Sequence, residues 1–217
     1  MIDPVTDVLL VVDVQPDFMP GGALPVPGGD QVVPVINRLL AGPFRHAVAT
    51  QDWHPPGHAS FASSHPGRAP FETVTLPYGA QTLWPDHCVQ GTPGAALHAG
   101  LDQSRIELIL RKGVHPLVDS YSAFRENDRV TFTGLDAWLR ARGFVRLFLA
   151  GLATDYCVAW SAEDAVLAGF EVVVVEDACR GIGLPTGPGR TTVDEARDLL
   201  RQAHGVRFVE SGAVLSG

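Results

Sequence analysis

The alternation of short apolar runs with longer stretches of helical periodicity constrains the fold of this chain more than any other feature. The first run, Val8–Val14, is rich in Val and Leu and apolar on both faces, which is typical of a strand buried in a parallel sheet. Further runs predict strands at His46–Thr50, Ile106–Arg111, Arg146–Ala150, Glu171–Glu176 and Val206–Val209.

The segments between these strands predict helices at Gly29–Leu40, Asp136–Arg142, Asp155–Leu167 and Thr192–His204. Thr192 and Glu195 form a capping-box pattern at the start of the last helix. The alternation predicts a single doubly wound α/β domain over residues 1–217, with a mostly parallel sheet and helices on both faces. Residues 53–92 are dense in Pro, Gly, His and Ser, and we predict a long functional loop there.

The charge balance and the cysteine count limit the partners and the compartment. The chain carries 16 basic and 24 acidic residues, a net charge of −8, so it repels nucleic-acid backbones. No apolar run approaches the roughly 18 residues of a membrane span, and the N-terminus lacks the basic start of a signal peptide. The three cysteines cannot all pair, which favours a reducing compartment. We expect a cytoplasmic monomer or homo-oligomer that binds a small molecule and neither nucleic acid nor membrane.

Chemically active residues follow four of the predicted strands. Asp13 interrupts the first run, Asp52 and His54 follow the second strand, Lys112 follows the third and Cys157 follows the fourth. Ligands of open α/β sheets bind outside the carboxyl ends of the strands. We therefore expect these side chains to meet at one edge of the sheet.

Lys112 is the only lysine, beside fifteen arginines. A genome biased toward Arg codons explains why lysine is scarce, but not why this one remains. Lysine can shift its pKa and take part in proton chemistry, which favours a functional role. Asp13 is a candidate general base because a buried carboxylate needs a partner or a raised pKa; capping of nearby loop amides is the alternative.

Cys157 lies where a loop turns into a helix. A helix N-terminus lowers the pKa of a thiol, and free backbone N–H groups at such a turn can hold an oxyanion. We predict that Cys157 is a nucleophile. The alternative, an inert buried thiol, is the prediction for Cys88 and Cys179.

Asp52 and His54 are two residues apart, so in an extended segment they point the same way and can share a cation. His58 follows in the loop, and His87 lies near its far end. Two histidines and a carboxylate with open positions suit a divalent metal, with Zn, Fe or Mn as candidates; a chance surface cluster is the alternative.

Three aromatic residues are predicted to line a substrate pocket: Phe18, Trp84 and Tyr121. Phe18 and Trp84 flank predicted site residues, which favours this role for them. The alternative is a place in the core, where aromatic residues near a strand edge are more often found.

Five segments together resemble the nicotinamidases, which belong to the isochorismatase-like cysteine hydrolases. They are Asp13–Phe18, Gln51–Pro55, Trp84–Val89, Lys112–Gly113 and Gly151–Val158. The Asp, Lys and Cys segments mark the superfamily, whereas D-W-H-P together with W-P-x-H-C is typical of nicotinamidases. The segments occur in the family's order, and the strand pattern extends the resemblance to most of the chain.

The resemblance implies an isochorismatase-like, Rossmann-like fold and assigns roles to particular residues. The implied triad is Asp13, Lys112 and Cys157. The implied ligands of one divalent metal, with zinc favoured, are Asp52, His54 and His87, with His58 as a further ligand or a supporting group. The family also has a cis peptide, here at Leu152–Ala153, and an oxyanion hole formed by the N–H groups of Ala153 and Cys157.

The implied reaction is hydrolysis of nicotinamide to nicotinate and ammonia through a cysteine thioester, with the metal positioning the pyridine ring. Pyrazinamide is a possible further substrate, and NAD salvage is the implied role. Three alternatives remain open: another small-amide hydrolase of the superfamily, a metallohydrolase in which Cys157 is incidental, and a zinc-stabilised module without activity. Alkylation of Cys157 separates the thiol mechanism from the metallohydrolase, because only the thiol mechanism requires Cys157. Metal removal would unfold the zinc-stabilised module but only inactivate the enzyme.

Overall fold

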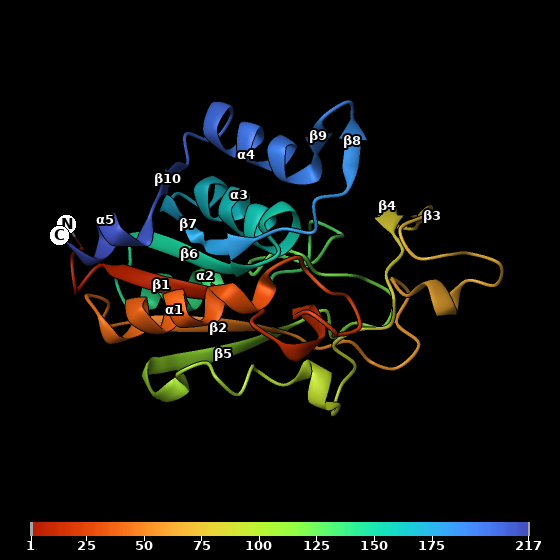
Figure 1. Ribbon diagram of the computed structural model, residues 1–217, viewed down its shortest axis with the longest axis horizontal. Helices are drawn as coiled ribbons and strands as arrows, with labels where there is room; N and C mark the ends of the chain where they lie inside the picture. Colours follow the sequence, from red (N-terminus) through yellow and green to blue (C-terminus); the bar gives the residue numbers. More distant parts are fainter. Residues whose placement is uncertain (1, 217) are drawn as a thin grey trace.

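Six parallel strands form the central sheet of the computed structural model, which describes residues 2–216 (Figure 1). Their order across the sheet is β10–β7–β6–β1–β2–β5. Their bounds are Asp7–Val12 for β1, Ala47–Asp52 for β2, Ile106–Lys112 for β5, Arg146–Leu152 for β6, Glu171–Arg180 for β7 and Arg207–Val209 for β10. The chain builds outward from β1 to β5 and then from β6 to β10, so the strand order reverses between β1 and β6. A ligand site is expected at this point, beyond the carboxyl ends of the strands.

Helices cover both faces of the sheet, as predicted. On one face lie α1 (Val32–Ala41) and the short α5 (Ser211–Leu215), which contact each other. On the other lie α2 (Leu135–Ala141) and α3 (Ala159–Leu167). The last long helix, α4 (Thr192–Gln202), packs on α3 and is the outermost element at the top of Figure 1. No helix among residues 2–216 is long and apolar enough to cross a membrane.

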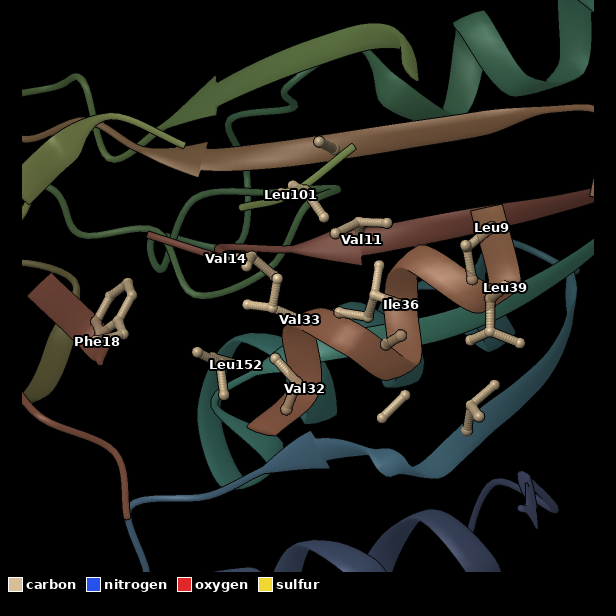
Figure 2. Close-up of a cluster of buried hydrophobic side chains, with 14 of the residues drawn as sticks. Leu9, Val11, Val14, Phe18, Val32, Val33, Ile36, Leu39, Leu101 and Leu152 are labelled. Carbon is tan, nitrogen blue, oxygen red and sulfur yellow. The ribbon is translucent and has the colours of Figure 1, made fainter. Parts of the chain in front are cut away.

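Strand β1 divides its side chains between the two faces. Leu9 and Val11 point toward α1, where they meet Ile36 and Leu39 (Figure 2). Val8, Leu10 and Val12 belong to the core beneath α2 and α3. Complete burial of such a side chain stabilises the fold by about 1.5–3 kcal/mol. This double burial explains why the run lacks a polar face.

The predicted strands and helices are all present, with shifted bounds. Helix α1 begins at Val32, after a 3-10 turn at Gly29–Gln31, and the predicted helix at Asp155 begins with a π-helical turn, Thr154–Val158. Strand β7 continues to Arg180 because Cys179 and Arg180 pair with the end of β6 after a register shift. Two hairpins and α5 were not predicted. The hairpins are β3–β4 (Thr73–Leu76 and Gly79–Thr82) and β8–β9 (Pro185–Gly187 and Arg190–Thr191).

The capping box of α4 lies one residue earlier than predicted. Thr191 is the cap residue, and its hydroxyl accepts the N–H of Asp194, whose carboxylate accepts the N–H of Thr191 at 2.9 Å. Thr192 cannot serve as the cap because its hydroxyl donates to Asp155. The predicted pair of Thr192 and Glu195 is therefore wrong.

Candidate active site

A buried lysine, Lys112, lies at the centre of the site. The Nζ atom of Lys112, the last residue of β5, lies 2.9 Å from Asp13 Oδ2 and 3.4 Å from Cys157 Sγ. It also lies 3.0 Å from Asp52 Oδ1 and donates to the carbonyl oxygen of Ser120 at 2.8 Å. Because parallel strands end at one edge, residues more than 140 positions apart in the chain meet here, as the strand-end argument predicts.

Asp13 follows β1 directly and is completely buried. Thr50 donates its hydroxyl to Asp13 Oδ1 at 2.7 Å, and the same hydroxyl accepts the N–H of Asp13 at 3.1 Å. The carboxylate is thus held by Lys112 and Thr50 rather than by loop amides. Burial raises the pKa of Asp13 above its usual range, although Lys112 acts in the opposite direction. The raised pKa suits Asp13 to accept a proton. The thiol of Cys157 contacts the same lysine and is the nearby group that could supply this proton.

Cys157 lies in the π-helical turn that follows β6, and only 6% of its surface is exposed. The prediction that this setting lowers the thiol pKa is wrong for the free protein. Burial raises the pKa of Cys157 well above its usual range, and the carboxylates of Asp13 and Asp52 raise it further despite Lys112. The thiol is therefore protonated at rest, and a nucleophilic role requires a base to remove its proton.

Two neighbouring carboxylates keep Lys112 protonated. Burial alone would lower the pKa of this ammonium, but the carboxylates of Asp13 and Asp52 raise it well above its usual range. The site therefore contains one fixed positive charge between two carboxylates.

Three nitrogen and oxygen donors beside this cluster could hold a metal ion. His54 Nε2 lies 3.2 Å from Asp52 Oδ2, and His87 Nε2 lies 3.5 Å from the same oxygen. All three residues are buried. The Nδ1 atom of His54 hydrogen-bonds the carbonyl of Gly113 at 3.0 Å, and that of His87 the carbonyl of Pro85 at 2.8 Å. A carbonyl can only accept, so each Nδ1 carries a proton and each Nε2 points toward the possible ion. Without metal, burial opposes protonation of His54, but the Asp52 carboxylate raises its pKa to about 9, so His54 would release its Nε2 proton when a metal binds.

This donor set fits a divalent metal. Two neutral imidazoles and a carboxylate with positions left open suit Zn²⁺, and also Fe²⁺ or Mn²⁺. Burial opposes ionisation of Asp52, but His54 and Lys112 hold its pKa well below the usual range, so the carboxylate is charged. Gly113 is required here: its φ is +65°, and a Cβ would approach His54 Cε1 to 2.5 Å.

His58 lies directly beside His54, with ring centroids 4.4 Å apart. Its Nδ1 accepts the hydroxyl of Ser60 at 2.7 Å, and its Nε2 donates to the carbonyl of His115 at 2.9 Å. Both ring nitrogens hydrogen-bond protein groups, although His58 also forms a second possible donor group with His54 and Asp119. Its role as a further ligand stays a prediction.

A small cavity opens onto Asp52, His87 and Cys157. Phe18, Trp84 and Tyr121, which were predicted to line a pocket, all do so. Trp84 donates its indole N–H to the Tyr121 hydroxyl at 3.1 Å, and Phe18 packs against His87 with ring centroids 5.5 Å apart. The other lining residues are Leu24, Asp52, His87, Asp119, Ala153, Tyr156, Cys157 and Ile182.

The peptide bond between Leu152 and Ala153 is cis, as the resemblance implies. Ala153 and Cys157, the two residues expected to form the oxyanion hole, both line the cavity. Cys157, Asp52 and His87 thus share one cavity with the aromatic walls, whereas Asp13, Lys112 and His54 are not among its lining residues.

Sequence reasoning missed several residues at this site. Asp119 Oδ1 lies 3.9 Å from His54 Nε2, and Gln15 accepts the N–H of Asp52 at 2.8 Å while donating to its carbonyl at 2.9 Å. Asp119 lies in an irregular segment with no periodicity to reveal it. Gln15 lies within a segment that carries the family resemblance, which was the signal available. Leu24, Tyr156 and Ile182 were also missed.

Comparison with known proteins identifies the family. Residues 7–186 match the isochorismatase domain, so the chain belongs to the isochorismatase family. It is an amidohydrolase, and several of the proteins to which it is similar are nicotinamidases. The nicotinamidase of Acinetobacter baylyi is 54% identical over 176 residues, which cover 81% of this chain and 82% of that protein.

Two solved structures extend the comparison. The Acinetobacter baumanii nicotinamidase/pyrazinamidase superposes with a TM-score of 0.93 at 47% identity, covering 98% of this chain and 100% of that one. The Pyrococcus horikoshii pyrazinamidase, solved in complex with zinc, superposes with a TM-score of 0.71 at 35% identity, covering 94% and 98%. These similarities confirm the predicted fold class and the predicted family.

Proposed function

We propose that this chain hydrolyses nicotinamide to nicotinate and ammonia through a thioester on Cys157. The observation that carries the proposal is the contact of Lys112 with both Asp13 and Cys157, because Cys157 also lines the aromatic cavity. The nicotinamidase similarity supplies the substrate.

In the acylation half, Asp13 takes the proton of Cys157, and the thiolate attacks the carboxamide carbon. The oxyanion that forms is held by the N–H groups of Ala153 and Cys157; losing one such donor typically costs about 3–4 kcal/mol. Asp13 then protonates the departing nitrogen. The C–N bond breaks, ammonia leaves, and a thioester remains.

In the second half, water attacks the thioester and Asp13 receives its proton. The C–S bond breaks and releases nicotinic acid, which loses its carboxyl proton to solvent and becomes nicotinate, while Asp13 returns its proton to Cys157. Lys112 keeps its charge throughout, orients Asp13 and balances the negative charge shared by Asp13 and the thiolate.

Asp52, His54 and His87 would hold a divalent metal, for which zinc is the leading candidate because a similar protein was solved with zinc. When bound, the ion would supply a Lewis-acid contact for the pyridine nitrogen. Phe18 and Trp84 would restrict the ring from its sides. Such positioning can contribute about 7–11 kcal/mol to lowering the barrier in favourable cases.

Ammonia release from nicotinamide and from benzamide by the purified protein tests the proposal, with and without a chelator. Benzamide carries the same carboxamide but lacks the ring nitrogen. We expect hydrolysis of nicotinamide, a much lower kcat/KM for benzamide, and loss of the difference after chelation. Equal hydrolysis of both amides by the metal-loaded protein would instead favour a different small-amide hydrolase.

A further inference from the structure

The segment that follows β7 passes over the nucleophile turn and supplies one wall of the cavity. Ile182 in this segment is half-buried and lines the cavity together with Leu24 and Tyr156. The proposed chemistry at Cys157 does not use this segment, although it borders the space in which a substrate would lie.

The buried carboxylate of Asp155 hydrogen-bonds the segment that forms this wall. Asp155 precedes Cys157 by two residues and is 7% exposed. Its Oδ1 accepts the N–H of Ile182 at 3.0 Å, and its Oδ2 accepts the N–H of Gly183 at 2.9 Å and the hydroxyl of Thr192 at 2.5 Å. The same acidic side chain therefore joins the nucleophile turn, the wall and the start of α4.

The backbone around Ile182 is shaped for this close approach. A Cβ on Gly181 would lie 2.9 Å from Asp155 Oδ1 and 2.3 Å from Val193 Cγ2, so only glycine fits there. Gly183 has a φ of +73°, a conformation that favours glycine. Thr192 also accepts the N–H of Leu184 at 3.0 Å, which closes the base of the β8–β9 hairpin onto α4.

The geometry points to Ile182 as a specificity-determining residue that limits the size of the ring amide accepted, with Asp155 as the positioning residue that holds it against the cavity. This inference deepens the proposed function and rests on it for the identity of the substrate. An isosteric amide at position 155 has one acceptor oxygen and presents an NH₂ group to backbone N–H donors, so it cannot hold both Ile182 and Gly183.

The space around Cys157 can be measured by alkylation, without any assumption about the substrate. The probes are iodoacetamide and the bulkier N-phenyl iodoacetamide, and the readout is the ratio of their alkylation rates at Cys157. Peptide mass spectrometry separates Cys157 from the buried thiols of Cys88 and Cys179. The ratio reports the space around the nucleophile even if nicotinamide is not the substrate.

We expect Ile182→Ala, which removes three carbon atoms from the wall, and Asp155→Asn each to raise the bulky-to-small ratio by at least about tenfold, the low end of the effect of one methylene in a pocket. Asp177→Asn is the matched control. The Asp177 carboxylate also accepts an N–H and a hydroxyl, both from Ser211, but it is not among the residues that line the cavity. Thr192→Val removes one of the three donors to Asp155 and should give an intermediate ratio if Asp155→Asn does not fold.

The second readout is kcat/KM for nicotinamide and for nicotinamides methylated on the ring. Ile182→Ala and Asp155→Asn should shift this preference toward a methylated ring, whereas Asp177→Asn should not. An unchanged alkylation ratio in Ile182→Ala, or Asp155→Asn behaving like Asp177→Asn, would overturn the inference. Inactivity of the wild type toward nicotinamide would refute the proposed function alone, because the alkylation ratio still tests the wall.

Discussion

Asp52 and Lys112 join the catalytic cluster to the metal donors. Asp52 Oδ1 lies 3.0 Å from Lys112 Nζ, while Asp52 Oδ2 faces the Nε2 atoms of His54 and His87. One carboxylate therefore belongs to both groups. Its removal should affect metal binding and the charge balance of the catalytic cluster together.

Because Asp52 belongs to both groups, substitutions of His87 and of Asp52 should have different effects on kcat. His87→Ala should lose divalent metal and raise KM while leaving the Lys112–Asp52 pair intact. Asp52→Ala should lose metal and also lower kcat, because Lys112 loses one of its two carboxylates. Elemental analysis and steady-state kinetics measure these effects. Full metal occupancy in both variants would remove these residues from the ligand set.

Lys112→Arg should fold and keep its metal but lose turnover by about a hundredfold. Lys112 is completely buried, and its Nζ is surrounded by Asp13, Asp52 and the carbonyl of Ser120. A planar guanidinium is larger than an ammonium and would displace Asp13, and a shift of about 1 Å can cost this much in rate. Near wild-type turnover would instead make Lys112 a structural ion-pair partner.

Gly113→Ala should weaken metal binding, because the added Cβ would collide with the His54 ring. Gly134→Ala is the matched control, since Gly134 also has a positive φ, but no atom lies within 4 Å of the position that its Cβ would take. Both changes should cost about 1–3 kcal/mol from backbone strain. Only Gly113→Ala should lower the metal content measured by elemental analysis; equal metal content in both would contradict the proposed contact.

Glu126 should make the stability of the protein depend on pH. Burial raises the pKa of this carboxyl to about 7, against a lowering effect of Lys112, while its value in the unfolded chain is near 4.5. Between these values the folded state holds the proton and the unfolded state does not, so stability falls as the pH rises from about 4.5 to 7.

Glu126→Gln should remove this dependence. Relative to wild type, the variant should gain about 2 kcal/mol of unfolding free energy between pH 5 and pH 8, as measured by denaturant unfolding. A difference between the two proteins that stays constant across this range would mean that Glu126 is ionised in the folded state.

The features of the site that depend on strand order could be predicted from the sequence. Asp13, Lys112 and Cys157 were placed together because parallel strands end at a common edge, and the structure brings them within contact of one ammonium. The pKa of Cys157 was predicted in the wrong direction. The helix-end argument is local, whereas burial and the nearby carboxylates depend on segments far away in the chain.

Other features have no local signal in the sequence. Asp119 comes from an irregular loop, and its distance from His54 depends on how that loop is folded. Asp155 was visible beside the nucleophile, but its bonds to Ile182 and Gly183 join segments 27 and 28 residues apart. The hydroxyl of Thr192 was assigned to a helix cap because its actual partner, Asp155, is distant in sequence.

The thiol of Cys157 is the centre of the proposed mechanism, and Cys179 provides its control. Both are buried free cysteines, but only Cys157 lines the cavity beside Lys112. Cys179→Ala should therefore retain turnover, apart from any loss of stability caused by the smaller side chain.

The turnover of nicotinamide by Cys157→Ala, measured as ammonia release by protein with full metal content and unchanged secondary structure, tests this account most directly. Removal of a catalytic nucleophile can lower kcat by about 10⁶-fold, and we expect no detectable hydrolysis. Turnover within about tenfold of wild type would contradict nucleophilic catalysis by Cys157.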